Sequence, residues 1–388
     1  MPIVNRVAEF HDEVKAWRHD IHAHPELLFD VHRTAGVVAE KLKSFGCDQV
    51  VSGIGRTGVV GVIRGRRGDG QRAIGLRADM DALPITEATG LPYQSTVPGK
   101  MHACGHDGHT AMLLGAAKYL AETRNFDGTA VVIFQPAEEG GGGGREMVKD
   151  GMMERFAIEE VYGMHNYPGF PIGNFAIRPG PMMAAADRIY IDLEGLGGHA
   201  ARPHTTIDTV LVGAAMVNQL QSIVARNVDP LESAVISITQ FHAGTADNII
   251  PQTARLSGTA RSLTPEVRDI VERRLFEVVE GTAKLYGAKA KLTYKRDYPV
   301  TRNHDKQTAF AAQVASQVVG AERVDPAVPP VMGAEDFSYM LEARPGAFIF
   351  VGNGDSAGLH HPEYNFNDEA IPFGTSYWVK LAETALAG

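Results

Sequence analysis

Cys104 and His106 are the residues of this sequence whose types and spacing most directly suggest metal chemistry. They stand on either side of Gly105 in the segment M-H-A-C-G-H-D-G-H. Because a glycine allows a sharp backbone turn, both side chains can point to one place, where a thiolate and an imidazole can bind a transition metal. A closed structural zinc site is the alternative to an open catalytic site. Neighbouring acids and the long glycine run Gly140 to Gly144 favour the open site.

Further residues of metal-binding types follow predicted strands. Asp79 and Asp81 come after one strand, Glu138 and Glu139 follow a second, and His165 ends a third. In α/β sheets, ligands collect just beyond the carboxyl ends of the strands. A set that mixes thiolate, imidazole and carboxylate groups is typical of zinc, cobalt, nickel or manganese, whereas calcium and magnesium prefer oxygen ligands. The sequence therefore predicts a transition-metal site at one edge of a sheet.

The neighbouring Glu138 and Glu139 suggest how such a site could work. Consecutive side chains of an extended segment point to different sides, so one carboxylate can bind metal while the other faces bound water. The free carboxylate could then accept a proton from that water and later protonate a leaving amine. A further loop, which contains His360 and His361 before Pro362, offers another imidazole after a strand. These residues predict metal-assisted hydrolysis of an acyl group.

The elements that must position these residues alternate between helices and strands. Strands are predicted at 58–63, 73–77, 129–134, 160–165 and 347–351, and helices at 34–45, 109–122, 145–149, 306–319, 334–342 and 374–387. This alternation predicts an α/β fold in which helices cover both faces of a central sheet.

Between these elements the pattern changes to a separate α+β module. Strands are predicted at 188–194, 234–240, 255–261 and 288–294, and helices at 208–227 and 265–286. Their order, β-α-β-β-α-β, is the ferredoxin-like arrangement. We therefore expect a catalytic domain at residues 1–184 and 295–388, interrupted by a lid domain at 185–294.

Composition excludes several classes of protein. The 388 residues are 44% hydrophobic and carry a net charge of -9, which argues against a nucleic-acid partner. Cys47 and Cys104 provide no disulfide framework, which agrees with a reducing compartment. The apolar runs are too short to span a membrane, and the first ten residues lack the apolar centre of a secretory signal. We expect a cytoplasmic protein with no membrane partner.

Eight short motifs together resemble a known enzyme family. They are H-P-E-L (24–27), R-A-D-M-D-A-L-P (77–84), M-H-A-C-G-H-D-G-H (101–109), Q-P-A-E-E-G-G-G-G (135–143), G-M-H-N (163–166), G-G-H-A-A-R-P-H (197–204), G-A-E-D-F (333–337) and L-H-H-P-E-Y (359–364). They resemble the hippurate hydrolase, or N-acyl-amino-acid amidohydrolase, branch of the aminoacylase and carboxypeptidase-like two-metal peptidases. The resemblance runs from about residue 24 to 373 in unbroken order, and the cysteine-containing motif is specific to this branch.

The resemblance implies a role for each matching residue. It implies a metallopeptidase-like catalytic domain with two divalent metal ions, zinc, manganese, cobalt or nickel, held by Cys104, His106, Glu139, His165 and His360. His360 is preferred to His361 because the family ligand stands two residues before the proline. Glu138 matches the general base, and Asp81 matches the aspartate that orients a metal-binding imidazole. A turn-capping role is the alternative for Asp81.

Three residues of the inserted module also match the family. The resemblance implies that His199 stabilises the developing oxyanion, in some members in the site of a partner subunit. It implies that Asn248 and Arg261 contact the substrate, although Arg261 could equally be a surface residue of a strand. Closure of the lid would bring His199 towards the metal ions and exclude water.

The expected reaction is hydrolysis of the amide bond of a small N-acyl or N-aroyl amino acid, hippurate-like, with metal-bound water as the nucleophile. A dipeptidase or an N-acetyl-diaminopimelate deacetylase in the same framework is the first alternative. A non-catalytic ligand-binding protein is the second, but it would be favoured only if Glu138 or a ligand were lost. The family also suggests a homodimer or homotetramer.

Overall fold

The computed structural model describes residues 4–66 and 70–387. The chain forms two compact units. The larger unit contains Met1–Met182, Arg302–Pro329 and Asp336–Gly388, and the inserted unit contains Met183–Thr301 and Pro330–Glu335. The inserted unit thus extends a few residues beyond the predicted lid at either end, and it includes a short segment that the sequence assigned to the catalytic domain.

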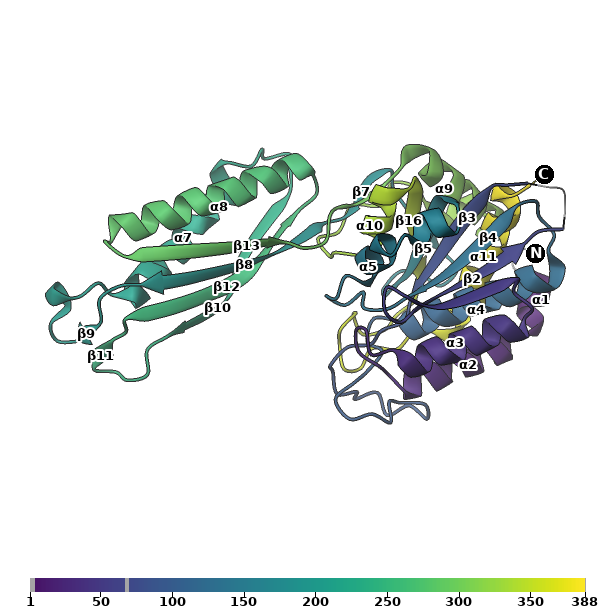
Figure 1. The fold of residues 1–388 in the computed structure, drawn as a ribbon, viewed down its shortest axis with the longest axis horizontal. Helices are drawn as coiled ribbons and strands as arrows, with labels where there is room; N and C mark the ends of the chain where they lie inside the picture. Colours follow the sequence, from purple (N-terminus) through teal and green to yellow (C-terminus); the bar gives the residue numbers. More distant parts are fainter. Residues whose placement is uncertain (1–3, 67–69, 388) are drawn as a thin grey trace. The chain divides into compact units, whose positions relative to one another are not determined.

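An eight-stranded mixed sheet forms the centre of the larger unit (Figure 1). Its spatial order is β1 (Gln49–Ile54), β2 (Gly58–Arg64), β4 (Thr129–Gln135), β3 (Ala73–Asp79), β5 (Ile158–Tyr167), β16 (Gly346–Gly352), β6 (Phe175–Ala176) and β15 (Val324–Asp325). The adjacent strands β4, β3, β5 and β16 are parallel to one another. Their carboxyl ends therefore lie at one edge of the sheet.

Helices cover both faces of this sheet. The longer ones are α2 (His11–Ala23), α3 (His32–Ser44), α4 (His106–Thr123), α9 (Asp305–Val319) and α11 (Ile371–Ala385), and the shorter ones are α1 (Asn5–Glu9), α5 (Gly143–Lys149), α6 (Met152–Arg155) and α10 (Ser338–Ala343). Leu76 and Ala78 of β3 belong to the core that includes α4 and α11. Arg77 between them points the other way and contacts Asp336 and Phe337, directly before α10.

The predicted strands of the larger unit are present, and the helices differ mainly at their starts. The helix predicted at 109–122 already begins at His106, and the one predicted at 334–342 begins only at Ser338. Before the second of these helices, the main-chain N–H of Asp336 donates to Glu138, and its side chain accepts a hydrogen bond from the main-chain N–H of Gly144 in α5. Helices α1 and α2 were not predicted, although Val14, Trp17 and Ile21 of α2 recur at helical spacing.

The inserted unit is the ferredoxin-like module that the sequence predicts. Its antiparallel sheet has the order β10 (Ala234–Ala243), β12 (Thr253–Ser262), β8 (Ala185–Glu194) and β13 (Lys289–Arg296). Helices α7 (Thr209–Arg226) and α8 (Pro265–Leu285) pack on it. Asp208 and Thr264 cap the starts of these helices by accepting hydrogen bonds from main-chain N–H groups, as their residue types predict.

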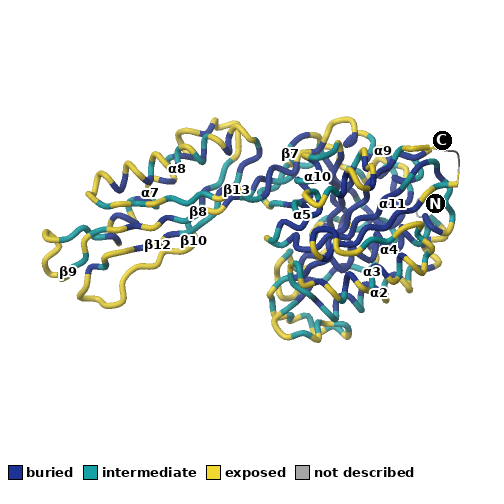
Figure 2. Tube along the Cα trace, in the orientation of Figure 1, coloured by how far each residue is buried: buried dark blue, intermediate teal, exposed yellow. Residues whose placement is uncertain are grey.

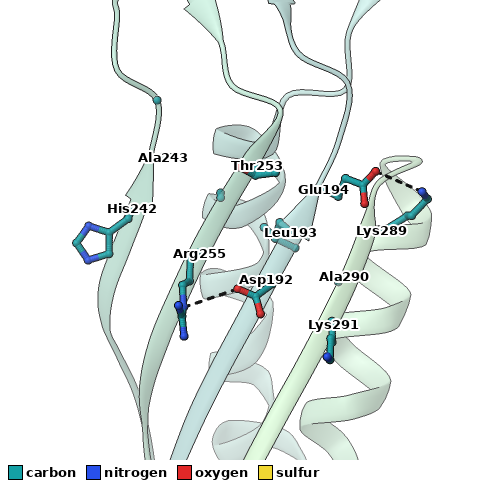
Figure 3. A pocket seen from close by; sticks show the side chains of 12 residues that line it. Asp192, Leu193, Glu194, His242, Ala243, Thr253, Arg255, Lys289, Ala290 and Lys291 are labelled. Carbon is teal, nitrogen blue, oxygen red and sulfur yellow. Dashed lines mark hydrogen bonds and ion pairs between the residues drawn. The ribbon is translucent and has the colours of Figure 1, made fainter.

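The other face of this sheet is open to solvent. Ile189, Ile191 and Leu193 of β8 point into the core, so the intervening Tyr190 and Asp192 point outwards. Figure 2 shows that the strands of this unit carry a mixture of buried and more exposed residues, whereas the central sheet of the larger unit is mostly buried. A cavity of about 780 Å³ lies on the open face near the end of β8. Its lining includes the charged residues Asp192, Glu194, Arg255, Lys289 and Lys291, and Figure 3 shows the pairs Asp192–Arg255 and Glu194–Lys289.

The remaining strands are short: β7 (Gly180–Met183) pairs with β14 (Thr301–Asn303), and β9 (Gly198–His199) pairs with β11 (Ile249–Ile250). Among the described residues, no helix is long and apolar enough to cross a membrane.

Candidate metal centre and active site

The predicted metal ligands of the larger unit lie where parallel strands end. Glu138 and Glu139 follow β4, His165 lies near the end of β5, and His360 lies in the loop after β16. Asp79 is the last residue of β3, which lies between β4 and β5. Parallel strands carry their carboxyl ends to the same edge, so residues far apart in sequence meet there.

Gly105 has the conformation that the predicted chelate requires. Its φ of +88° lies in the left-handed region, and it is the residue directly before α4. A Cβ atom there would lie 2.4 Å from Asn166 Oδ1 and 2.6 Å from Tyr364 OH, so a larger residue does not fit. His106 is therefore the first residue of a helix and not part of an extended loop. Cys104 Sγ lies 3.4 Å from His165 Nε2.

Each of the five predicted ligands belongs to at least one group of three residues, and these groups overlap. Within each group, the donor atoms lie within 4.8 Å of one another. The groups that contain them are Cys104, His106 and His165; Cys104, Glu139 and His360; His106, Glu138 and Glu139; and Asp79, His106 and His109. The structure thus places the predicted general base, Glu138, within the same cluster. The ligand and base assignments themselves remain predictions.

His360 and His361 differ in their surroundings. His360 Nε2 lies 3.3 Å from Glu139 Oε1, and its φ of +63° is unusual for a residue with a side chain. His361 Nδ1 instead accepts a hydrogen bond from the main-chain N–H of Glu363 within its own loop. This geometry favours His360 as the ligand.

Asp81 is buried and contacts both His106 and the pair of glutamates, Glu138 and Glu139. Its Oδ1 lies 3.4 Å from His106 Nδ1, which suits the predicted role of orienting this imidazole. Its two oxygens also accept hydrogen bonds from the main-chain N–H groups of Glu138 and Glu139, at 2.9 and 3.1 Å. The same carboxylate therefore supports the imidazole and fixes the backbone of the two glutamates.

The cluster has the electrostatic character of a cation site. Both ring nitrogens of His106 are buried and make no hydrogen bond in the described part of the chain. Burial lowers the pKa of His106, but the carboxylates of Asp79, Asp81 and Glu139 outweigh it and raise the pKa to about 10. The surroundings thus favour a positive charge at this imidazole, and a divalent ion can take the place of the proton. These residues fit a metal ion.

Asp79 is the centre of a buried network that the sequence only partly indicated. Its carboxylate accepts hydrogen bonds from His109 Nδ1 at 2.6 Å and from Arg77 at 2.7 Å. Burial raises the pKa of Asp79, but the nearby His106, Arg77 and His109 outweigh it and hold the pKa well below its usual range. His109 had a detectable signal, because it stands three residues after His106 and thus on the same side of a helix.

The inserted unit brings together two of its three predicted site residues. His199 lies in β9 opposite Ile249 of β11, and the carbonyl of Asn248 accepts a hydrogen bond from Ala200 N–H. His199 Nδ1 accepts a hydrogen bond from Ala201 N–H, so a neutral ring carries its proton on Nε2.

Arg261 lies apart from this pair. It is the penultimate residue of β12, and the strand runs roughly 26 Å from Thr253, beside β11, to Arg261. The guanidinium of Arg261 donates a hydrogen bond to the carbonyl of Ala260 and is half-buried. Burial lowers the pKa of Arg261. Within the inserted unit, Arg261 therefore lies far from His199.

Comparison with known proteins places this geometry in a family. Residues 75–384 match the model of peptidase family M20/M25/M40. The chain belongs to this family. It is similar to the hippurate hydrolase of Campylobacter jejuni, with 42% identity over 98% of this chain and 99% of that protein. It is also similar to the N-acetylcysteine deacetylase of Bacillus subtilis, with 38% identity over 97% and 98% of the two chains.

A solved member of the M20 family has the same fold. It is a dinuclear metal-binding peptidase from Bacillus subtilis, which is 33% identical to this chain with a TM-score of 0.85, over 98% of this chain and 99% of that one. As a member of the M20/M25/M40 family with these relatives, the chain is a metal-dependent amidohydrolase. The resemblance, the fold class and the enzyme class expected from the sequence are thereby confirmed.

Proposed function

We propose that this enzyme hydrolyses the amide bond of small N-acyl or N-aroyl amino acids, hippurate-like substrates included. One observation carries the proposal: Glu138, a buried carboxylate, shares a cluster with His106 and Glu139, whose donor atoms lie within 4.8 Å of one another. A potential proton acceptor thus lies beside potential metal ligands. The similarity to a hippurate hydrolase and to an N-acetylcysteine deacetylase supports this substrate class.

Five residues would hold two divalent ions: Cys104, His106, Glu139, His165 and His360. Bound ions would lower the pKa of coordinated water towards roughly 7 and polarise the substrate carbonyl. The mixed thiolate, imidazole and carboxylate set favours zinc, manganese, cobalt or nickel. Asp81 would keep His106 and the backbone of the two glutamates in place, because it contacts all three.

Glu138 would move the proton. Its carboxylate accepts a proton from water as the water oxygen bonds to the amide carbon. It then delivers this proton to the amide nitrogen as the C–N bond breaks, which yields a carboxylic acid and a free amino acid. Glu138 is buried next to the cluster, close to the proposed ligands His106 and Glu139.

In the proposed reaction the inserted unit serves as a lid, and His199 would act from it. Because its Nδ1 is occupied by Ala201 N–H, its Nε2–H is available to donate a hydrogen bond to a developing oxyanion. Asn248, its neighbour in the lid, would contact the substrate, and Arg261 would do so only from a different part of the lid.

We further propose that the protein is cytoplasmic and forms a homodimer or homotetramer.

A substrate and metal panel tests the proposed function. Metal-free protein would be incubated with zinc, manganese, cobalt or nickel and with N-benzoyl amino acids, N-acetyl amino acids and dipeptides, and amino-acid release would be measured. We expect release from the N-acyl substrates only when metal is present. Faster release from dipeptides would favour the dipeptidase alternative, and no metal-dependent release from any substrate would refute the proposal.

A further inference from the structure

A closed ring of buried polar side chains lies behind Glu138. The Arg77 Nε–H donates to Gln135 Oε1 at 2.9 Å, and Arg77 Nη2 donates to Asp336 Oδ1 at 3.1 Å. Gln135 Nε2 closes the ring with a hydrogen bond of 2.7 Å to the same Asp336 oxygen. All three side chains are fully buried.

Asp336 connects this ring to both ends of the loop that carries Glu138. Its main-chain N–H donates to Glu138 Oε1 at 3.3 Å, and its Oδ2 accepts a hydrogen bond of 2.8 Å from Gly144 N–H. The loop thus has one contact to Asp336 at its glutamate and another where α5 begins. Gln135, the last residue of β4, anchors the same loop at its start.

The glycine run is what allows this close approach. A Cβ atom on Gly143 would lie 1.7 Å from the carbonyl oxygen of Pro136, so the chain can reverse here only with glycine. A Cβ atom on Gly144 would lie 2.8 Å from the carbonyl oxygen of Asp336. These glycines therefore allow the loop to turn back on itself and to pack closely against Asp336.

We propose that Asp336 is a positioning residue that holds the carboxylate of Glu138 in its orientation for proton transfer. The proposal rests on the proposed function, in which Glu138 is the base. Asp336 acts through its main-chain N–H, and its carboxylate fixes that N–H by bonding to Arg77, Gln135 and Gly144. Buried charges paired in this way have few alternative arrangements, because any other leaves a charge without a partner.

The test replaces Asp336 by asparagine, which keeps its size and removes its charge. We expect kcat to fall on the order of 10- to 100-fold, because a small misplacement of a reacting group has effects of this size. KM and the metal content per chain should stay within about two-fold of wild type. Metal content is measured by mass spectrometry, and folding of the metal-free protein is followed by circular dichroism.

Glu160→Gln is the matched control. Glu160 forms an ion pair with Arg72 and accepts hydrogen bonds from Tyr162 and Gln307, so the substitution also neutralises a largely buried carboxylate that has an arginine partner. It lies near the start of β5, whereas the cluster lies at the other end of the strand. Its kcat should stay within about two-fold of wild type.

The double variant Glu138→Gln/Asp336→Asn tests whether Asp336 acts through Glu138. If it does, Asp336→Asn lowers kcat no further once Glu138 is replaced, because residues that act as a unit are not additive. Independent, multiplicative losses would overturn the proposal. Wild-type turnover in Glu138→Gln alone would instead refute the general base of the proposed function.

A second variant covers the case that Asp336→Asn does not fold. Gly144→Ala changes no charge and pushes against the carbonyl of Asp336. A several-fold lower kcat with unchanged KM and metal content supports the positioning role. The proposal is overturned if a folded Asp336→Asn variant has turnover within two-fold of wild type. If Asp336→Asn is unfolded, the same result in Gly144→Ala overturns it. A loss of kcat that is explained by loss of metal also overturns the proposal.

Discussion

Two regions of the molecule are built from the same kinds of charged residue and use them differently. At the candidate metal centre, Arg77 and Asp79 form an ion pair of 2.7 Å in which both side chains are fully buried. On the open face of the inserted unit, Arg255 and Asp192 lie 3.7 Å apart and keep more than half of their side-chain surface exposed (Figure 3). Burial, and not residue type, decides what such a pair contributes.

The physical reason is solvation. The charges of an exposed pair give up some of their hydration to form the pair, and solvent screens their attraction. Such a pair therefore contributes little to the free energy of unfolding. A buried pair must satisfy every charge within the protein, because water cannot compensate for a lost partner. The first region is therefore fixed in one arrangement, as a catalytic centre requires, and the second can change with little effect.

The largest expected effect concerns the histidines near the carboxyl terminus. His360→Ala should lower the metal content and reduce turnover by at least about 100-fold, because it removes a proposed ligand beside Glu139. His361→Ala is the matched control and should behave like wild type, because this ring bonds within its own loop. Bound metal and kcat are measured for both. Equal metal content in His360→Ala and wild type would refute the assignment.

A comparison of two aspartates tests the effect of burial directly. Asp79→Asn should lower the free energy of unfolding of the metal-free protein by about 3 kcal/mol, because it removes one of the two buried carboxylates that pair with Arg77 and the carboxylate that His109 contacts. Asp192→Asn makes the same chemical change on the open face and should cost less than about 1 kcal/mol. Urea unfolding measures both. Equal losses would mean that burial does not separate the two regions.

Acid should remove the difference between wild type and Asp79→Asn. The folded state holds the pKa of Asp79 well below the ordinary value of 3.8. The stabilisation is therefore complete above about pH 4 and is lost as the pH falls through the folded pKa. The stability difference between the two proteins should be constant from pH 7 to about 5 and shrink below about pH 4. A difference that grows on acidification would contradict this assignment.

The smallest expected effect is on the open face itself. Lys289 pairs with Glu194 at 3.3 Å and is largely exposed. Lys289→Ala should change the free energy of unfolding by less than about 0.5 kcal/mol and leave kcat unchanged. A clear loss of turnover would show that this face takes part in the reaction, and would thus remove the contrast between the two regions.

The sequence alone determined the fold class and most of the elements, because their patterns are local. Each helix and strand, and the capping residues Asp208 and Thr264, can be recognised from a short stretch of sequence. The alternation of the elements and the β-α-β-β-α-β order then follow from their succession along the chain. The cluster around Cys104-Gly105-His106 could also be predicted, since its residues have the types that metals bind and two of them, Glu139 and His165, lie at the ends of parallel strands.

Only the tertiary structure decided how these residues are supported. No local pattern shows that Asp79 bonds to His109, that Asp81 holds the backbone of two glutamates, or that Asp336 closes a ring with Arg77 and Gln135. Such partners are far apart in sequence and meet only when the sheet has assembled. A buried polar group is defined by what surrounds it, and the surroundings come from the whole fold.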